Sequence, residues 1–126
     1  MRVGIPTEIK NNENRVAITP AGVHELTRRG HDVFIQAGAG IGSGFSDADY
    51  VAQGAKMLAT AEEVWAAGDL LLKVKEPIKA EYSLMRRDQV LLGFLALPAT
   101  ALWALACRWG STKGPFLRLR GIPGSY

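Results

Sequence analysis

Apolar and polar residues follow two different spacings along the first 95 residues, and the changes between them mark strands and helices. Short apolar runs bounded by Gly, Pro or Asp predict strands, and longer stretches with one apolar face predict helices. The predicted strands cover residues 2–5, 32–37, 56–59, 70–75 and 89–95. The predicted helices cover residues 20–29, 47–53, 61–67 and 80–85. Strands and helices are therefore expected to alternate along the chain.

Capping residues support three of these helix starts. Thr19 followed by Pro20 is typical of an N-cap and a first helical position. Ser46 is placed to cap the next helix, and Thr60 with Glu63 has the spacing of a capping box.

The alternation predicts an α/β fold with a parallel, helix-flanked sheet. The apolar run over residues 70–75 is typical of a strand buried on both faces of such a sheet. A length of 126 residues gives room for one domain with a genuine core.

Composition is that of a globular protein, with 48% hydrophobic and 21% charged residues. All 12 acidic residues lie in residues 1–88, together with 11 of the 15 Lys and Arg. Residues 89–126 carry the other four cations and no acid: Arg108, Lys113, Arg118 and Arg120. Four spread cations without a recognisable binding module are weak support for a nucleic-acid partner, so we expect none.

The cysteine content and the hydropathy of the chain exclude further classes of protein. The single cysteine, Cys107, excludes an internal disulfide framework, and we expect no metal site. The N-terminus lacks the apolar stretch of a signal peptide. The longest apolar stretch, residues 89–107, is interrupted by Pro98, so we expect no membrane span and a cytoplasmic location.

A glycine-rich stretch over residues 38–44 invites a dinucleotide-binding interpretation. Counted from Gly38 or from Gly40, the sixth position is Ser43 or Phe45, so neither start completes the G-x-G-x-x-G fingerprint. We predict a tightly turning loop here and place no cofactor-binding residue in this chain.

Two cations stand beside apolar residues next to a proline-marked break, Arg15 in the loop before Pro20 and Lys75 at the end of the strand before Pro77. A guanidinium matches the planar fork of a carboxylate, and an ammonium is a compact charge suited to a polarised oxygen. If the two converge, they form a site for a small carboxylate that also carries a carbonyl. The residues alone leave open the alternative of two solvated surface charges.

The match to a known family lies in residues 1–10 and 13–20 (the latter Glu-Asn-Arg-Val-Ala-Ile-Thr-Pro), 29–33 with 38–40, 45–50 with 54–55, and 72–77 with 81–82. These segments resemble the N-terminal domain of the alanine dehydrogenases and of the related transhydrogenase subunit. The resemblance covers about residues 1–95. The Lys-Val-Lys-Glu-Pro segment at 73–77 favours the alanine dehydrogenase branch over the transhydrogenase branch.

The family converts L-alanine, NAD and water into pyruvate, ammonia and NADH. The resemblance implies a flavodoxin/Rossmann-like substrate domain, incomplete here, with NAD bound by a separate domain absent from this chain, and a homo-oligomeric family protein. It implies that Arg15 binds the substrate carboxylate and Lys75 the carbonyl or amino side of the reacting carbon. We expect Glu8 and Glu13 to orient these cations, the alternative being two solvated loop acids.

The family pattern fails at the general acid/base. Its histidine lies in a Phe-Leu-His-Leu-Ala segment, and Ala96 stands at that position here, so no complete catalytic set is expected. His24 and His31 are expected to have surface or capping roles instead. This chain alone is therefore expected to be inactive.

The residues after the resemblance predict a second region. We expect a family domain over residues 1–95 and a basic tail over residues 96–126 without family similarity. Our hypothesis is truncation or a frameshift near residues 93–97, which the other reading frames of the downstream DNA test; a natural divergent C-terminus is the alternative. The alternative functions are part of a transhydrogenase alpha subunit and a non-catalytic partner of a separately encoded Rossmann domain.

Overall fold

The computed structural model describes residues 1–75 and 77–94, and within them the predicted alternation of strands and helices is confirmed. The strands are β1 (Arg2–Ile5), β2 (Asp32–Gln36), β3 (Lys56–Leu58), β4 (Leu70–Lys75) and β5 (Val90–Phe94). The helices are α1 (Pro20–Arg28), α2 (Asp47–Ala52), α3 (Ala61–Ala67) and α4 (Lys79–Tyr82), with a 3₁₀ turn η1 (Ile41–Ser43). The helix predicted over residues 80–85 is a single turn. No helix in this part of the chain is long and apolar enough to cross a membrane.

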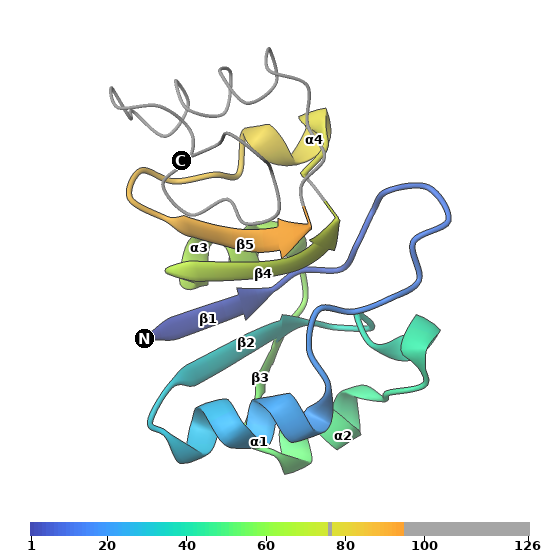
Figure 1. Ribbon diagram of the computed structural model, residues 1–126, viewed down its shortest axis with the longest axis vertical. Coiled ribbons are helices and arrows are strands. Elements are labelled where there is room, and N and C mark those ends of the chain that lie inside the picture. The colour runs from blue at the N-terminus through green and yellow to red at the C-terminus, as the bar shows by residue number, and fades with distance from the viewer. Residues whose placement is uncertain (76, 95–126) are drawn as a thin grey trace.

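The five strands form one sheet in the order β3-β2-β1-β4-β5, and every neighbouring pair is parallel. Figure 1 shows the arrows of β1, β2, β4 and β5 pointing the same way. The chain moves outward from β1 to β3, then returns to the other side of β1 with β4. Loops leaving β1 and β4 therefore diverge at the carboxyl edge of the sheet, and open α/β sheets bind ligands at such a switch point.

The sheet lies between two layers of helices. One core is built from β1, β2, α1 and α2 and contains Val3, Ile5, Val23, Val33, Ile35 and Tyr50. The other is built from α3, β4, β5 and the segment after α4 and contains Val64, Trp65, Leu71, Met85 and Leu91. Both faces of β1 are buried, so this strand is held firmly in place. The loop that forms part of the candidate site follows it.

Two local predictions need correction. The run over residues 70–75 is not buried evenly on both faces, because Leu70 and Leu72 lie half-buried at the margin of the first core while Leu71 is fully buried. The capping box predicted at Thr60 is half formed: its hydroxyl accepts the Glu63 N–H, but the Glu63 carboxylate accepts the N–H of Ala59 instead. Thr19 and Ser46 cap α1 and α2 as predicted.

The glycine-rich loop turns tightly, as predicted, with positive φ at Gly38 and Gly44. It also packs against the segment that carries Arg15. The Ser43 hydroxyl donates to the Asn14 carbonyl oxygen at 3.2 Å, and a Cβ added to Gly42 would lie 2.6 Å from that same oxygen. The absence of a side chain at Gly42 is therefore required by a neighbouring backbone and not by a phosphate.

Replacing Gly42 by Ala should displace the Arg15 segment, because the new methyl group meets a backbone oxygen. We expect a loss of about 1–3 kcal/mol in the free energy of unfolding, as is typical of overpacking. Amide NMR signals of Asn14 and Arg15 should also move. Gly44→Ala is the matched control: nothing lies within 4 Å of its added Cβ, so its backbone strain should leave those two signals in place. Unmoved signals in Gly42→Ala would contradict the supporting role of the loop.

Candidate functional site

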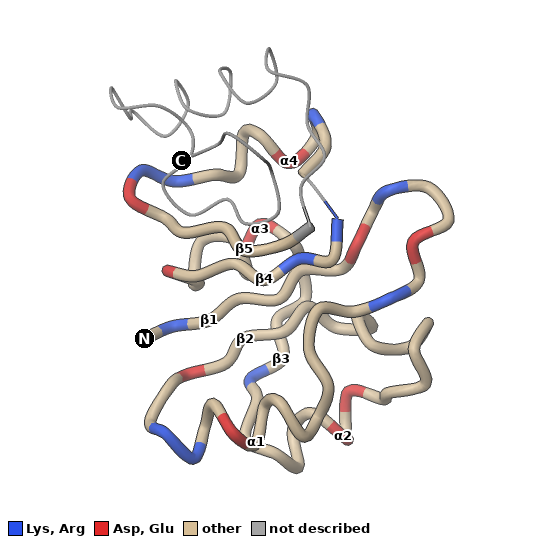
Figure 2. Tube along the Cα trace, viewed as in Figure 1, with Lys and Arg blue, Asp and Glu red and all other residues tan. Residues whose placement is uncertain are grey.

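The candidate site lies at the carboxyl edge of the sheet, between the loop of residues 6–19 and the end of β4. Figure 2 shows basic and acidic positions gathered where this loop passes beside the strand end. The loop leaves β1 and returns to α1, whose first turn is capped by Thr19. Tyr50 of α2 donates a hydrogen bond from its hydroxyl to the Ile18 carbonyl oxygen at 2.8 Å, which holds the far end of the loop.

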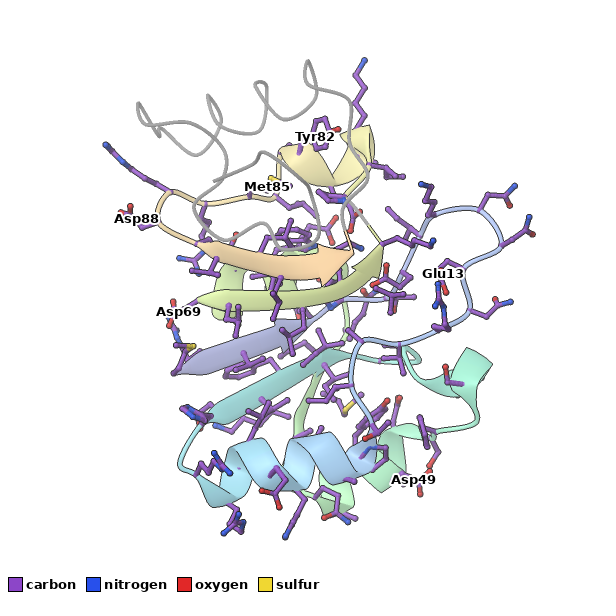
Figure 3. The ribbon with its side chains drawn as sticks, viewed as in Figure 1. Glu13, Asp49, Asp69, Tyr82, Met85 and Asp88 are labelled. Atoms are coloured by element: carbon purple, nitrogen blue, oxygen red, sulfur yellow. The ribbon has the colours of Figure 1, made fainter. Side chains whose placement is uncertain are left out.

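Arg15 is held by Glu13 in a two-point ion pair. Its Nε lies 2.8 Å from Glu13 Oε1 and its Nη2 lies 2.8 Å from Oε2, and the Arg15 backbone N–H also donates to Oε1. The Glu13 side chain is only 7% exposed, whereas that of Arg15 is 65% exposed. Figure 3 shows Glu13 on the loop beyond the strand ends. The acid is thus shielded and fixes one edge of the guanidinium, while the cation faces solvent.

Charged groups on the loop and near the end of β4 influence one another's pKa values. The hydrogen bond from the Arg15 side chain lowers the pKa of Glu13 to about 2, opposed by burial and assisted by the charges of Arg15 and Lys75. The pKa of Arg15 is raised, first by its hydrogen bond with Glu13 and in smaller part by the charge of Glu8. The charge of Lys75 thus makes the smallest contribution to the shift of the Glu13 pKa, and the charge of Glu8 makes the smallest contribution to the shift of the Arg15 pKa.

Lys75 is the last residue of β4 and is half-buried. Glu8 contacts its backbone: Glu8 Oε1 accepts the Lys75 N–H at 3.0 Å, and Oε2 accepts the Val74 N–H at 3.0 Å. Of the two acids expected to orient the cations, Glu13 binds a guanidinium and Glu8 binds the strand end. Glu8 is 7% exposed, so the alternative of a solvated loop acid does not hold for it.

Sequence reasoning missed a buried ion-pair cluster beneath this edge, formed by Glu8, Lys73 and Glu81. Lys73 Nζ lies 3.3 Å from Glu8 Oε1 and 3.1 Å from Glu81 Oε2. The alternation of side chains along the strand could have revealed this cluster, because Lys73 follows the buried Leu71 by two positions and so lies on the same face of the sheet. A lysine on a buried face requires an acidic partner.

Other predicted residues do not join the described site. His24 is exposed on α1, and a ring nitrogen of His31 contacts the amino group of Met1. Ala96, the general acid/base position, and the tail of residues 96–126 lie outside the described residues. Across residues 1–75 and 77–94, no group of three His, Cys, Asp or Glu side chains is arranged to hold a metal ion.

The ion pair predicts an unusual titration of Glu13. Its carboxyl has a pKa of about 2 in the folded chain against an ordinary value of 4.5. A carboxyl with a lowered folded pKa stabilises the fold above its unfolded pKa, and this contribution is lost as pH falls from 4.5 through about 2. Carboxyl ¹³C NMR should show Glu13 still ionised between these two values. In Arg15→Gln the midpoint should move back toward 4.5, and an unchanged midpoint would rule out this cause.

Comparison with known proteins shows a family to which the chain is similar. The family model described as "Alanine dehydrogenase/PNT, N-terminal domain" matches residues 4–108. An alanine dehydrogenase of Mycobacterium tuberculosis (strain ATCC 25618 / H37Rv) is 68% identical over 100 residues, which are 79% of this chain and 27% of that protein. An alanine dehydrogenase of Methanococcus maripaludis is 54% identical over 97 residues, covering 77% of this chain and 26% of that protein.

Solved structures give the same result. An L-alanine dehydrogenase matches with a TM-score of 0.77 and 44% identity, over 86% of this chain and 29% of that chain. A transhydrogenase from Sinorhizobium meliloti matches with a TM-score of 0.70 and 36% identity, over 75% of this chain and 27% of that chain. This chain thus spans about a quarter of the length of these relatives.

The family match reaches residue 108, beyond the boundary expected near residue 95. That boundary, the non-family character of residues 96–126 and the origin of the tail stay predictions. The fold and the family resemblance inferred from the residues are confirmed. The chain belongs to the family of alanine dehydrogenase and transhydrogenase N-terminal domains.

Proposed function

We propose that this chain is the substrate-binding part of an alanine dehydrogenase-type oxidoreductase, which interconverts L-alanine and pyruvate with NAD. The observation that carries the proposal is the placement of the Arg15–Glu13 ion pair on the loop after β1 and of Lys75 at the end of the neighbouring β4, at the switch point of the sheet. The relatives named alanine dehydrogenase support it: among the solved structures, the L-alanine dehydrogenase is 44% identical and the transhydrogenase 36% identical. No observation on the described residues favours the transhydrogenase alternative.

Arg15 binds the substrate carboxylate. Glu13 uses Nε and Nη2, which form one edge of the guanidinium, so the edge formed by the two terminal nitrogens is the one presented to a ligand. The Arg15 side chain as a whole is 65% exposed, which agrees with a ligand binding there. A carboxylate bound there would pair with an already oriented fork, so little side-chain freedom remains to be lost on binding.

Lys75 binds the other end of the substrate. Its place at the end of β4 puts it at the same edge as the Arg15 loop. An ammonium beside the keto oxygen of pyruvate stabilises the negative charge that develops there during reduction. Arg15 therefore selects for an acid, and Lys75 selects for an oxygen or nitrogen substituent on the neighbouring carbon.

We propose no dinucleotide contact for the glycine-rich loop. The space of a Cβ at Gly40 is filled by the Tyr50 ring at 2.6 Å, and Gly42 packs against Asn14, whereas nothing lies within 4 Å of a Cβ at Gly38 or Gly44. Two glycines of the loop are thus explained by packing against protein atoms. NAD is the hydride acceptor of the family reaction, and we assign none of its contacts to residues 1–75 or 77–94. The role proposed for this chain is to bind and orient the substrate.

Pyruvate should bind the chain weakly, and Arg15→Ala should weaken that binding about tenfold or more, since a hydrogen bond to a charged group contributes about 1.5–3 kcal/mol. Isothermal titration calorimetry measures this. Arg28→Ala is the matched control, because Arg28 is also exposed and paired with an acid, Glu25, at 2.9 Å. Pyruvamide, which lacks the carboxylate, should not distinguish wild type from Arg15→Ala. Equal pyruvate affinity in wild type and Arg15→Ala would sink the carboxylate role.

The purified chain should form no NADH from L-alanine and NAD. A methyl group at Ala96 has no proton to transfer, and a general acid/base contributes typically about 10²–10⁴-fold. The measurement is NADH absorbance at high protein concentration, with Arg15→Ala assayed beside wild type to expose a contaminating enzyme. A rate that disappears in Arg15→Ala would belong to this chain and would contradict the expectation.

A further inference from the structure

The buried cluster of Glu8, Lys73 and Glu81 holds one more negative than positive formal charge. Each of its side chains is at most 4% exposed, and one ammonium faces two carboxylates. Burial of an unbalanced charge is costly unless hydrogen bonds compensate it. The hydrogen bonds that compensate the buried charge therefore identify the backbone segments that the cluster holds in place.

Glu8 receives its compensation from the end of β4. The consecutive N–H groups of Val74 and Lys75 both donate to its carboxylate, each at 3.0 Å. Successive N–H groups of a regular strand point to opposite edges, so the backbone must turn here. The pairing of β4 with β5 shifts between Leu72 and Lys75, which is the same place. Glu8 thus holds the irregular strand end from which the Lys75 side chain projects.

Glu81 carries the same charge but contacts a different part of the backbone. Its Oε1 accepts the N–H of Ile78 at 3.1 Å, at the start of its own helix α4, and its Oε2 meets Lys73. The two acids are therefore equivalent in the charge balance of the cluster. They differ in that Glu8 alone, of the two, is hydrogen-bonded to the residue proposed to bind substrate.

Glu8 also lies on the other arm of the site. It follows β1 in the loop that leads to Glu13 and Arg15. Its charge makes the smallest contribution to the raised pKa of Arg15. One buried carboxylate therefore connects both arms of the proposed substrate site.

We propose that Glu8 is a positioning residue that fixes the backbone of Lys75 beneath the Arg15 loop and thereby sets the affinity for an α-keto acid, with Lys73 holding the Glu8 carboxylate in place. This inference rests on the proposed function. Glu8 makes no direct contact with substrate in this role.

The test compares Glu8→Gln with Glu81→Gln in the full 126-residue chain, with pyruvate as the probe. Each substitution removes one carboxylate and leaves a formally neutral pair with Lys73, so the two are matched in charge. Glutamine at position 8 has one acceptor oxygen for the two N–H groups. We expect Glu8→Gln to bind pyruvate at least fivefold more weakly and to shift the Val74 and Lys75 amide proton signals. Glu81→Gln should bind within twofold of wild type and leave those signals in place.

Each outcome decides the proposal. Equal weakening by both variants would reduce the cluster to a structural ion pair, and wild-type affinity in Glu8→Gln would remove the positioning role while sparing the proposed function. No pyruvate binding by the wild-type chain would remove the proposed function and this role together. If Glu8→Gln does not fold, the wild type is decisive: saturating pyruvate should slow hydrogen exchange at Val74 and Lys75 more than at Ile35, and uniform slowing would overturn the proposal.

Discussion

A single buried carboxylate joins the two halves of the candidate site. Glu8 leaves the end of β1, enters the protein interior and binds two backbone N–H groups at the end of β4. The buried ammonium of Lys73 makes this arrangement tolerable, because a carboxylate in a low-dielectric interior needs both a counter-charge and hydrogen bonds. The relative position of the Arg15 loop and the Lys75 strand end depends on this contact.

The order of the strands explains why the candidate site lies at this point of the described sheet edge. β1 and β4 are neighbours, yet the chain leaves them in opposite directions across the sheet. The loop after β1 therefore has space to fold over the carboxyl edge instead of passing directly into a helix against its neighbour. The glycine-rich loop closes this space from the β2 side, through Ser43 and Gly42 against Asn14.

The charged side chains of the candidate site differ in how deeply they are buried. Glu8, Lys73 and Glu81 are buried and shape the backbone, whereas Arg15 is exposed and has one edge fixed by a shielded Glu13. In the proposed site, a ligand carboxylate would meet a cation that Glu13 already holds at one edge, while the buried charges would remain out of its reach. This division suits a domain that binds and orients a small anion. The named relatives of this family are nearly four times as long as the segment that they share with this chain, so a role in substrate binding would be one part of a larger protein's function.

Residue spacing and capping residues were enough to predict the parallel α/β fold and the helix caps at Thr19 and Ser46, and they left Arg15 and Lys75 as candidate substrate-binding residues. Hydrophobic spacing and capping chemistry are local, so a single sequence reveals them. Three contacts became known from the folded chain alone: Glu8 binds the backbone of β4, Lys73 is buried between two acids, and Asn14 lies against Gly42. These contacts join residues far apart in the chain, and their partners are fixed by strand order and depth of burial, which no local pattern records.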